Sequence, residues 1–368
     1  MKKAIALLNK TIADEPWSRD YLILIGAYGA TGDLAAAEKA AVKGIAMTRQ
    51  KIARMSSNSK KMARLADKIT GNRANLLGMQ AILHRLRGEY DKEEQYWRET
   101  VRLSESVMNK APAKWIHSQI ALANFLHRRN RHMEAELEAR EAVEKSIGLS
   151  GKISLILGDA LRVIAKIKLA QGRYDEAEKL VRHELVILKE SGVAEDSSSV
   201  AKARSLLARI LTSKGDHAGA VKEYEVLVKS LKRNKAILGA IVISPELLLS
   251  LIEVGRTQDA AAFIRKKYEK VKRRTGENSV KTARYLGLQG LAGYKEGNIS
   301  QAQKDFSAAI PRLSGARSGN GTVLVKSIIE NYIAMLAEIS GTAREKGLGI
   351  NAATEAFRMA ETLRGKIV

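Results

Sequence analysis

The sequence has no cysteine among its 368 residues, only 4 prolines, and aromatic residues that make up just 5% of the chain. Without cysteine there is no disulfide, no thiolate metal ligand and no cysteine nucleophile. The scarcity of aromatic residues argues against a β-sandwich or β-barrel, because aromatic and β-branched residues favour strands. Alanine, leucine, lysine, arginine, glutamate and isoleucine dominate instead, and this composition favours helices.

Long hydrophobic runs are also missing. The most apolar window, residues 236–252, is 17 residues long and is interrupted by Pro245 and Glu246, so we expect no membrane insertion. An apolar run at residues 4–8 is too short for the core of a signal peptide, and we expect a cytoplasmic protein. Apolar residues still make up 45% of the chain, which is enough for a folded core.

Acidic residues are under-represented: 63 lysines and arginines face 40 aspartates and glutamates, a formal net charge of +23. Such a charge favours anionic partners, namely nucleic acid, anionic lipid or an acidic protein face. Two stretches are especially basic. Residues 39–73 hold ten basic side chains and one acid, and residues 265–274 hold seven and one acid. Either these are solvated outer helix faces or they meet an anionic partner. Tyr268 is the one aromatic residue within the two stretches, and this scarcity weakens an interpretation based on stacking with single strands.

What is present is a repeat. Short helix breakers recur along the chain at intervals of 56, 42, 42, 43, 40 and 42 residues. The breakers stand at Gly32, Gly88, Asn130, Gly172, Gly215, Gly255 and Gly297.

The residues around each breaker repeat as well. Five residues after it, six of seven positions are alanine: Ala37, Glu93, Ala135, Ala177, Ala220, Ala260 and Ala302. Seven residues before it, most positions are small: Ile25, Ala81, Ala123, Ala165, Ala208, Leu248 and Gly290. Small residues on both sides of a tight turn let two helices cross closely. One such hairpin cannot bury its apolar face alone, so the pattern predicts an all-α fold, an α-α superhelix of about seven stacked hairpins.

A small residue, a turn glycine, an alanine and a later aromatic residue together resemble the tetratricopeptide repeat. The period near 42 residues is similar to the longer units of kinesin-light-chain-like arrays. The stretch Gly276-Glu277-Asn278-Ser279-Val280-Lys281-Thr282-Ala283 looks like the entry between two repeats of that subtype. The resemblance implies a scaffold that binds other proteins.

The C-terminal third carries a second resemblance. Residues 328–336 and 349–365 look like the end of the repeat array in bacterial CHAT-domain proteins, the second segment containing Ala356-Phe357-Arg358-Met359-Ala360-Glu361-Thr362-Leu363-Arg364-Gly365. In that family the array runs into a caspase-like protease domain with a His/Cys dyad. The resemblance implies that this chain is the regulatory half of such a protein and carries no catalytic residue.

We therefore expect three regions: a lone helix at residues 1–16 that is a truncated repeat, the array at 17–314, and a modified helix pair at 315–368 that leads to a missing domain. The long first interval predicts an insert within residues 55–71, with a helix starting near Lys60. Ser244, Pro245 and Glu246 predict a helix start, and so a shortened helix, inside a unit. Residues 315–321 are expected to form a loop before a helix at about 322–340.

Sites of chemistry are weakly indicated. Gly151-Lys152-Ile153-Ser154 lacks the first glycine and the strand of a phosphate loop and is predicted to be a connector. His127 and His132 are five residues apart, so we expect them to diverge. The acid pairs Glu93/Glu94 and Glu134/Glu138 are expected to face water. The sequence thus predicts no metal, no cofactor and no enzymatic activity.

The predicted ligand site is the concave face, which the first helix of each hairpin lines. The residue six before each turn points into it, and neighbours on the same face complete a ladder of one amide and several cations. The predicted groove residues are Asn124, His127, Arg128, Arg162, Lys166, Lys202, Arg209, Arg284 and Lys295. Such a ladder suits an extended peptide or protein segment with acidic character. The alternative is a basic solenoid that binds nucleic acid through its backbone phosphates.

Overall fold

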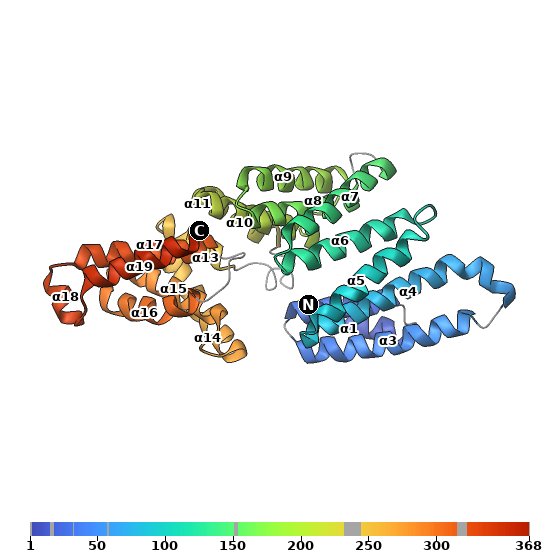
Figure 1. Cartoon of the computed structure of the whole chain (residues 1–368), viewed down its shortest axis with the longest axis horizontal. Helices are drawn as coiled ribbons and strands as arrows, with labels where there is room; N and C mark the ends of the chain where they lie inside the picture. Colours follow the sequence, from blue (N-terminus) through green and yellow to red (C-terminus); the bar gives the residue numbers. More distant parts are fainter. Residues whose placement is uncertain are drawn as a thin grey trace. The chain divides into compact units, whose positions relative to one another are not determined.

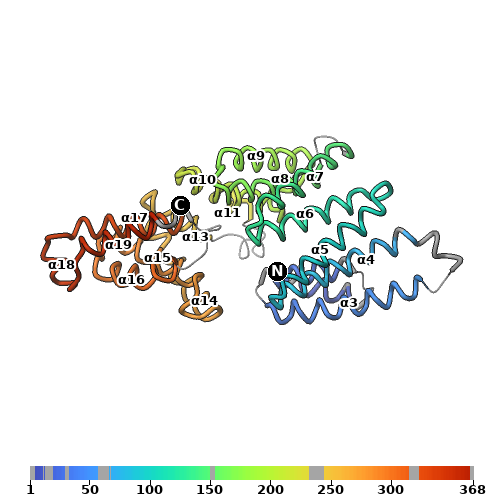
Figure 2. Tube along the Cα trace, viewed as in Figure 1, coloured from blue at the N-terminus to red at the C-terminus, as the bar shows by residue number. Residues whose placement is uncertain are grey.

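The computed structural model of the chain describes residues 2–14, 18–31, 33–56, 59–150, 154–231, 244–314 and 322–367 (Figures 1 and 2). These ranges contain eighteen helices and no strand, which confirms the predicted all-α class. The helices are α1 (Lys2–Asp14), α2 (Ser18–Thr31), α3 (Leu34–Ser56), α4 (Ser59–Arg87), α5 (Tyr90–Glu105), α6 (Pro112–Arg128), α7 (His132–Ser150), α8 (Leu155–Ala170), α9 (Tyr174–Glu190), α10 (Ser198–Lys214), α11 (His217–Ser230), α13 (Pro245–Glu253), α14 (Thr257–Thr275), α15 (Val280–Lys295), α16 (Ile299–Ser314), α17 (Thr322–Ile339), α18 (Ala343–Leu348) and α19 (Ala352–Ile367).

The chain divides into two compact units. Unit 1 contains α1 to α8, nearly all of α9, and α10 up to Ala203. Unit 2 contains α10 from Arg204 on, α11, and the helices from α13 to α19. Each described helix falls short of the length and apolar character that crossing a bilayer requires.

Both units are built from helix hairpins. In unit 1, α2 packs on α3, α4 on α5 and α6 on α7, and each hairpin also contacts the next through α3–α4, α5–α6 and α7–α8. In unit 2 the same arrangement joins α13 to α14, α14 to α15, and α15 to α16. The stacked-hairpin architecture predicted from the 42-residue period is therefore confirmed.

The predicted turns carry the backbone conformation that ends one helix and starts the next. Six of the seven breakers are described, and all six have positive φ, from 60° at Asn130 to 86° at Gly215. Glycine adopts this conformation without steric penalty, and asparagine is among the few other residues that tolerate it. The seventh, Gly32, lies outside the described residues.

The small positions that flank the turns lie where the two helices cross. All six alanines five residues after a turn have 0% exposure, as do Ala81, Ala123 and Ala165 before it. At Gly290 even a single added methyl group would come within 3.1 Å of the Phe306 ring. The small residues are therefore required by the close approach of the helices.

The two irregular units follow the sequence as well. The longer first interval is taken up by two lengthened helices: α3, the second helix of one hairpin, has 23 residues, and α4, the first helix of the next, has 29. Helix α4 begins at Ser59, next to the predicted start at Lys60. In unit 2, the Ser244 hydroxyl accepts a hydrogen bond of 3.3 Å from the Leu247 amide and caps α13, which has only 9 residues.

The chain ends are built differently from the central hairpins. Helix α1 packs on α2, and Ile12 joins the core beside Tyr21 and Leu24. Near the other end, α17 packs on α15, α16 and α19, with the Tyr332 ring 5.0 Å from that of Phe306. The boundaries at residues 16 and 314 stay predictions. The predicted connectors at 151–153 and 315–321, and Val368, lie outside the described residues.

Candidate functional site

One side of the α6–α8 pair carries a set of polar residues. The two first helices pack against each other, and most of their other surfaces are buried against α5, α7 and the rest of the core. The sides left accessible recur every three or four residues, as one helix face must. We call this set the α6–α8 polar face; it consists of His117, Asn124, Arg128, Asp159, Arg162 and Lys166.

Asn124 and Lys166 meet across the two helices. The Asn124 amide nitrogen donates to the Ile120 carbonyl at 2.8 Å, which fixes the side chain on α6. Its Oδ1 then accepts a hydrogen bond of 3.4 Å from the Lys166 ammonium on α8. Both residues stand six before a turn, so the repeat itself brings the amide and the cation together.

Arg162 is held by two acids at the edge of the same face. Its Nε donates to Glu184 at 2.6 Å, and its Nη2 donates to Asp159, one turn earlier on α8. Glu184 belongs to α9 and has 0% exposure. Burial raises the pKa of Glu184 to about 7, and the Arg162 guanidinium opposes that effect. Arg162 is therefore occupied within the chain in this structure.

Arg128 is held in the same way by α5. Its Nη2 donates to Glu93 at 2.7 Å, and the indole Nε1 of Trp97 donates to the same carboxylate oxygen at 3.2 Å. Glu93 has 1% exposure, so the expectation that this acid faces water is wrong. It stands at the helix crossing, where the other described units have alanine, and its charge is met by the next hairpin.

His127 and His132 do not diverge as expected. His127 lies in the last turn of α6 and His132 begins α7, so the turn at Asn130 brings the centroids of the two rings to 5.3 Å from each other. Burial lowers the pKa of His132, which favours its neutral form. Spacing on a single helix is the wrong guide for two residues that flank a hairpin turn.

The remaining predicted groove residues do not belong to the α6–α8 polar face. Lys202 is exposed on the unit 1 part of α10, and Arg209 is half-buried on the unit 2 part. Arg284 is half-buried, and its Nε atom is shielded from solvent. The Lys295 ammonium lies 5.8 Å from the centroid of the Tyr294 ring. On α13 and α15 the positions equivalent to Asn124 and Lys166 are the buried Leu249 and Leu291, because α17 packs on these two helices.

Sequence reasoning missed a series of polar pairs inside the hairpins. Each joins a first helix to a second helix, and the two partners stand at similar distances on either side of the turn. The pairs are Gln80–Tyr96, Gln119–Glu141, Arg162–Glu184, Arg204–Glu223 and Gln289–Asp305. Distance from the turn, rather than spacing along a helix, is the signal that would have found them.

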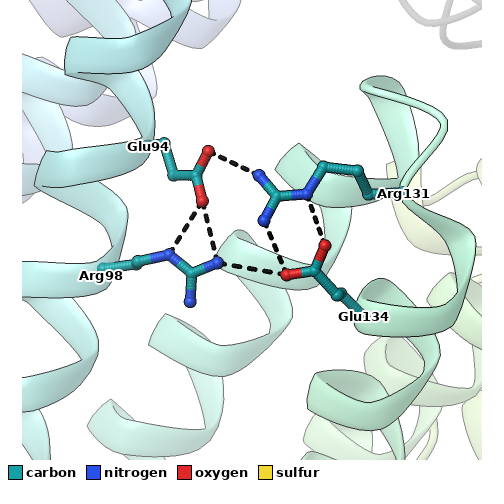
Figure 3. Close-up of polar contacts among 4 residues, drawn as sticks. All are labelled: Glu94, Arg98, Arg131 and Glu134. Atoms are coloured by element: carbon teal, nitrogen blue, oxygen red, sulfur yellow. Dashed lines mark hydrogen bonds and ion pairs between the residues drawn. The ribbon is translucent and has the colours of Figure 1, made fainter.

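Acids on the second helices form ion pairs that join neighbouring hairpins. Figure 3 shows Glu94 and Arg98 of α5 facing Arg131 and Glu134 at the start of α7. Arg131 donates to Glu94 and to Glu134, each at 2.6 Å, and Arg98 donates to Glu94 at 2.8 Å. These hydrogen bonds raise the pKa of Arg131 and lower that of Glu134. The four charges form a ring that links successive repeats.

A cavity of about 560 Å³ opens between α7, α8 and α9, on the side of α8 away from the polar face. Its apolar lining includes Leu161, Ile164 and Leu180, and Lys168 reaches it with only 2% exposure. The Lys168 ammonium donates to Glu136 at 2.6 Å. Burial alone would raise the pKa of Glu136, but hydrogen bonds from Lys168 and Arg140 lower it to about 2.

No group of three or more histidine and acidic side chains is arranged to hold a metal ion among the described residues. The polar face offers hydrogen-bond donors, an amide and cations. These groups suit recognition of carbonyls and carboxylates.

No protein-family model and no curated protein matches the chain. Several solved structures resemble it. One, of nearly identical TPR-like repeats from a Podosopora anserina protein described as a kinesin light chain, is 16% identical with a TM-score of 0.43. It covers 56% of this chain and 97% of its own.

A second is a tetratricopeptide repeat protein from Parabacteroides merdae, 14% identical with a TM-score of 0.41, covering 85% of this chain and 98% of its own. A third is BtubC (BKLC) from P. vanneervenii, 17% identical with a TM-score of 0.37, covering 75% and 92%. At this level of similarity, the assignment to stacked helical repeats rests on the chain's own hairpins and turns.

Proposed function

We propose that the chain is a protein-interaction scaffold and that its α6–α8 polar face binds an extended segment of another protein. The observation that carries this proposal is the contact between Asn124 and Lys166 on successive first helices. It supports a ladder of polar groups on two successive repeats.

The spacing of such a ladder suits an extended chain. Packed helices lie about 8–10 Å apart, and an extended peptide rises about 3.3 Å per residue. Polar groups on successive first helices would therefore meet about every third residue of a peptide laid across them. An amide can bond both the N–H and the C=O of a backbone, and an ammonium has three donors for carbonyls or carboxylates.

The partner proposed is acidic. His117 and Arg128 flank Asn124 on the exposed side of α6, and the whole chain has a net charge of +23. Asp159 is the acid on this face, and it is bonded to Arg162. A segment with a carboxylate near Lys166 is therefore favoured over a basic one.

We further propose that this scaffold is the regulatory repeat region of a bacterial, cytoplasmic CHAT-type protease system, with binding rather than catalysis as its own role. The support is the resemblance of residues 328–336 and 349–365 to the end of the array in such proteins. The test is the gene sequence downstream of the codon for Val368. An encoded caspase-like domain with a His/Cys dyad would support the proposal, and any other continuation would contradict it.

The binding proposal is tested by selecting a phage-displayed library of random peptides on the whole chain. The selected peptides should contain an acidic residue and should lose binding to the double variant Asn124→Ala/Lys166→Met. The matched control is Lys304→Met, which removes an exposed lysine of α16 in unit 2. Peptides that bind all three proteins equally would contradict the proposed site.

A further inference from the structure

Helix α14 carries a basic surface that the peptide site does not use. Its residues 265–274 include seven lysines and arginines and the single acid Glu269. The helix lies in unit 2 and packs against α13 and α15, at the edge of the unit in Figure 1.

The cations are distributed on the helix in a regular way. Ala260 and Ile264 are fully buried, and Tyr268 and Val271 pack against the core, so these four residues define the inner face. A different face bears residues that recur at three- and four-residue steps. We call it the α14 basic face; it consists of Phe263, Lys266, Lys267, Lys270, Arg273 and Arg274.

These five cations have no anionic partner among the described residues. The cation of this segment that does form an ion pair is Lys272, on another side of the helix, whose ammonium lies 3.2 Å from Glu277. Lys267 instead sits between like charges. Burial lowers its pKa, and the neighbouring Lys270 and Lys266 lower it further. The protein thus concentrates positive charge here without neutralising it, although its other helices contain many ion pairs.

We propose that the α14 basic face binds the phosphate backbone of double-stranded nucleic acid. From Lys266 to Arg274 the helix rises about 12 Å, and a duplex presents about seven phosphate charges over the same length. The five cations of the face match that density.

The chemistry favours nucleic acid over other anionic partners. The cores of protein–protein interfaces are apolar and poor in lysine, whereas the one large apolar side chain exposed on this face is Phe263, at 40%. A membrane-surface helix inserts its apolar side into the lipid, but the apolar side of α14 is packed in the core. Lysine and arginine side chains contact phosphate oxygens whatever the bases are, so we expect this face to bind a duplex without regard to its sequence.

The test uses the whole chain and a labelled duplex of about 24 base pairs and random sequence, measured by fluorescence anisotropy. Wild type should bind and should lose about a hundredfold in affinity between about 50 mM and about 200 mM salt, the loss expected for about four phosphate contacts. The variant Lys266→Glu/Lys270→Glu should lose at least about tenfold at the lower salt concentration, and Lys266→Arg/Lys270→Arg should keep wild-type affinity.

The matched control is Lys304→Glu/Lys346→Glu, which makes the same change in net charge at exposed lysines of α16 and α18. It should change the affinity less than about threefold, because distant exposed charges are screened. An equal loss in both reversal variants would show that the net charge attracts the duplex and would overturn the site. Phosphatidylserine vesicles and polyglutamate serve as competing probes. If either bound as tightly as the duplex, with the same sensitivity to Lys266 and Lys270, the assignment to nucleic acid would fail.

Discussion

The Arg128 guanidinium lies 2.7 Å from the Glu93 carboxylate, although the two residues belong to successive hairpins and are 35 positions apart. Glu93 stands where alanine packs at the crossing of the other described hairpins, and only 1% of its surface is exposed. The second unit of the array thus replaces a packing contact by a buried charge, and the third unit supplies the counter-charge. Burial lowers the pKa of Arg128, and Glu93 opposes this effect.

Removing Arg128 should therefore destabilise the chain more than removing both partners. Arg128→Met leaves Glu93 buried without its cation, and we expect a loss of about 2–3 kcal/mol in the free energy of unfolding. Glu93→Ala restores the residue of the other units, and adding Arg128→Met to it should cost less than about 1 kcal/mol. Urea denaturation of the four proteins measures both values. Additive effects would mean that the contact contributes nothing.

The alanines at the helix crossings leave no room for larger side chains. Ala177 and Ala220 both have 0% exposure. Ala177→Leu should overpack its crossing and cost about 1–3 kcal/mol, and Ala220→Glu should cost at least as much because it buries a charge. Thermal melts followed by circular dichroism measure the loss. A wild-type melting temperature for Ala220→Glu would contradict the assignment of the repeat.

Glu184 should make stability depend on pH. Its pKa is about 7 in the folded chain and near 4.5 otherwise, so the folded state holds this proton more tightly than the unfolded state does. Its contribution is therefore fully favourable below about pH 4.5 and is lost as the pH rises through 7, a change of about 3 kcal/mol.

Glu184→Gln removes that titration while keeping the shape of the side chain. Between pH 5 and pH 8, we expect the unfolding free energy of wild type to fall relative to that of the glutamine variant. Urea titrations at several pH values make the comparison. A constant difference between the two proteins would show that Glu184 is ionised throughout.

Much of the fold could be predicted from the sequence because the signals are local. A positive-φ residue such as Gly215 and a small residue such as Ala220 mark a hairpin whatever lies around it. The Ser244 cap and the start of α4 are local in the same sense.

The polar contacts could not be predicted in this way, because they join different helices. Glu93 was predicted to face water, because an acid on a second helix is usually exposed. Only the packing of the next hairpin shows that Arg128 contacts it. The pair Arg162–Glu184 depends on two helices that fold back on each other. The alignment of Asn124 with Lys166 did follow from the 42-residue period, but its role in binding stays a prediction.

The measurement that tests the proposed peptide face most directly is the affinity of a library-selected peptide for two charge-reversal variants. Lys166→Glu should weaken binding by about tenfold or more, since an attractive contact becomes repulsive. Its helicity and melting temperature should stay near wild type. Lys266→Glu on α14, with the same change in net charge, should alter peptide affinity less than about threefold. If Lys266→Glu weakened peptide binding more than Lys166→Glu, the α6–α8 polar face would not be the peptide-binding face.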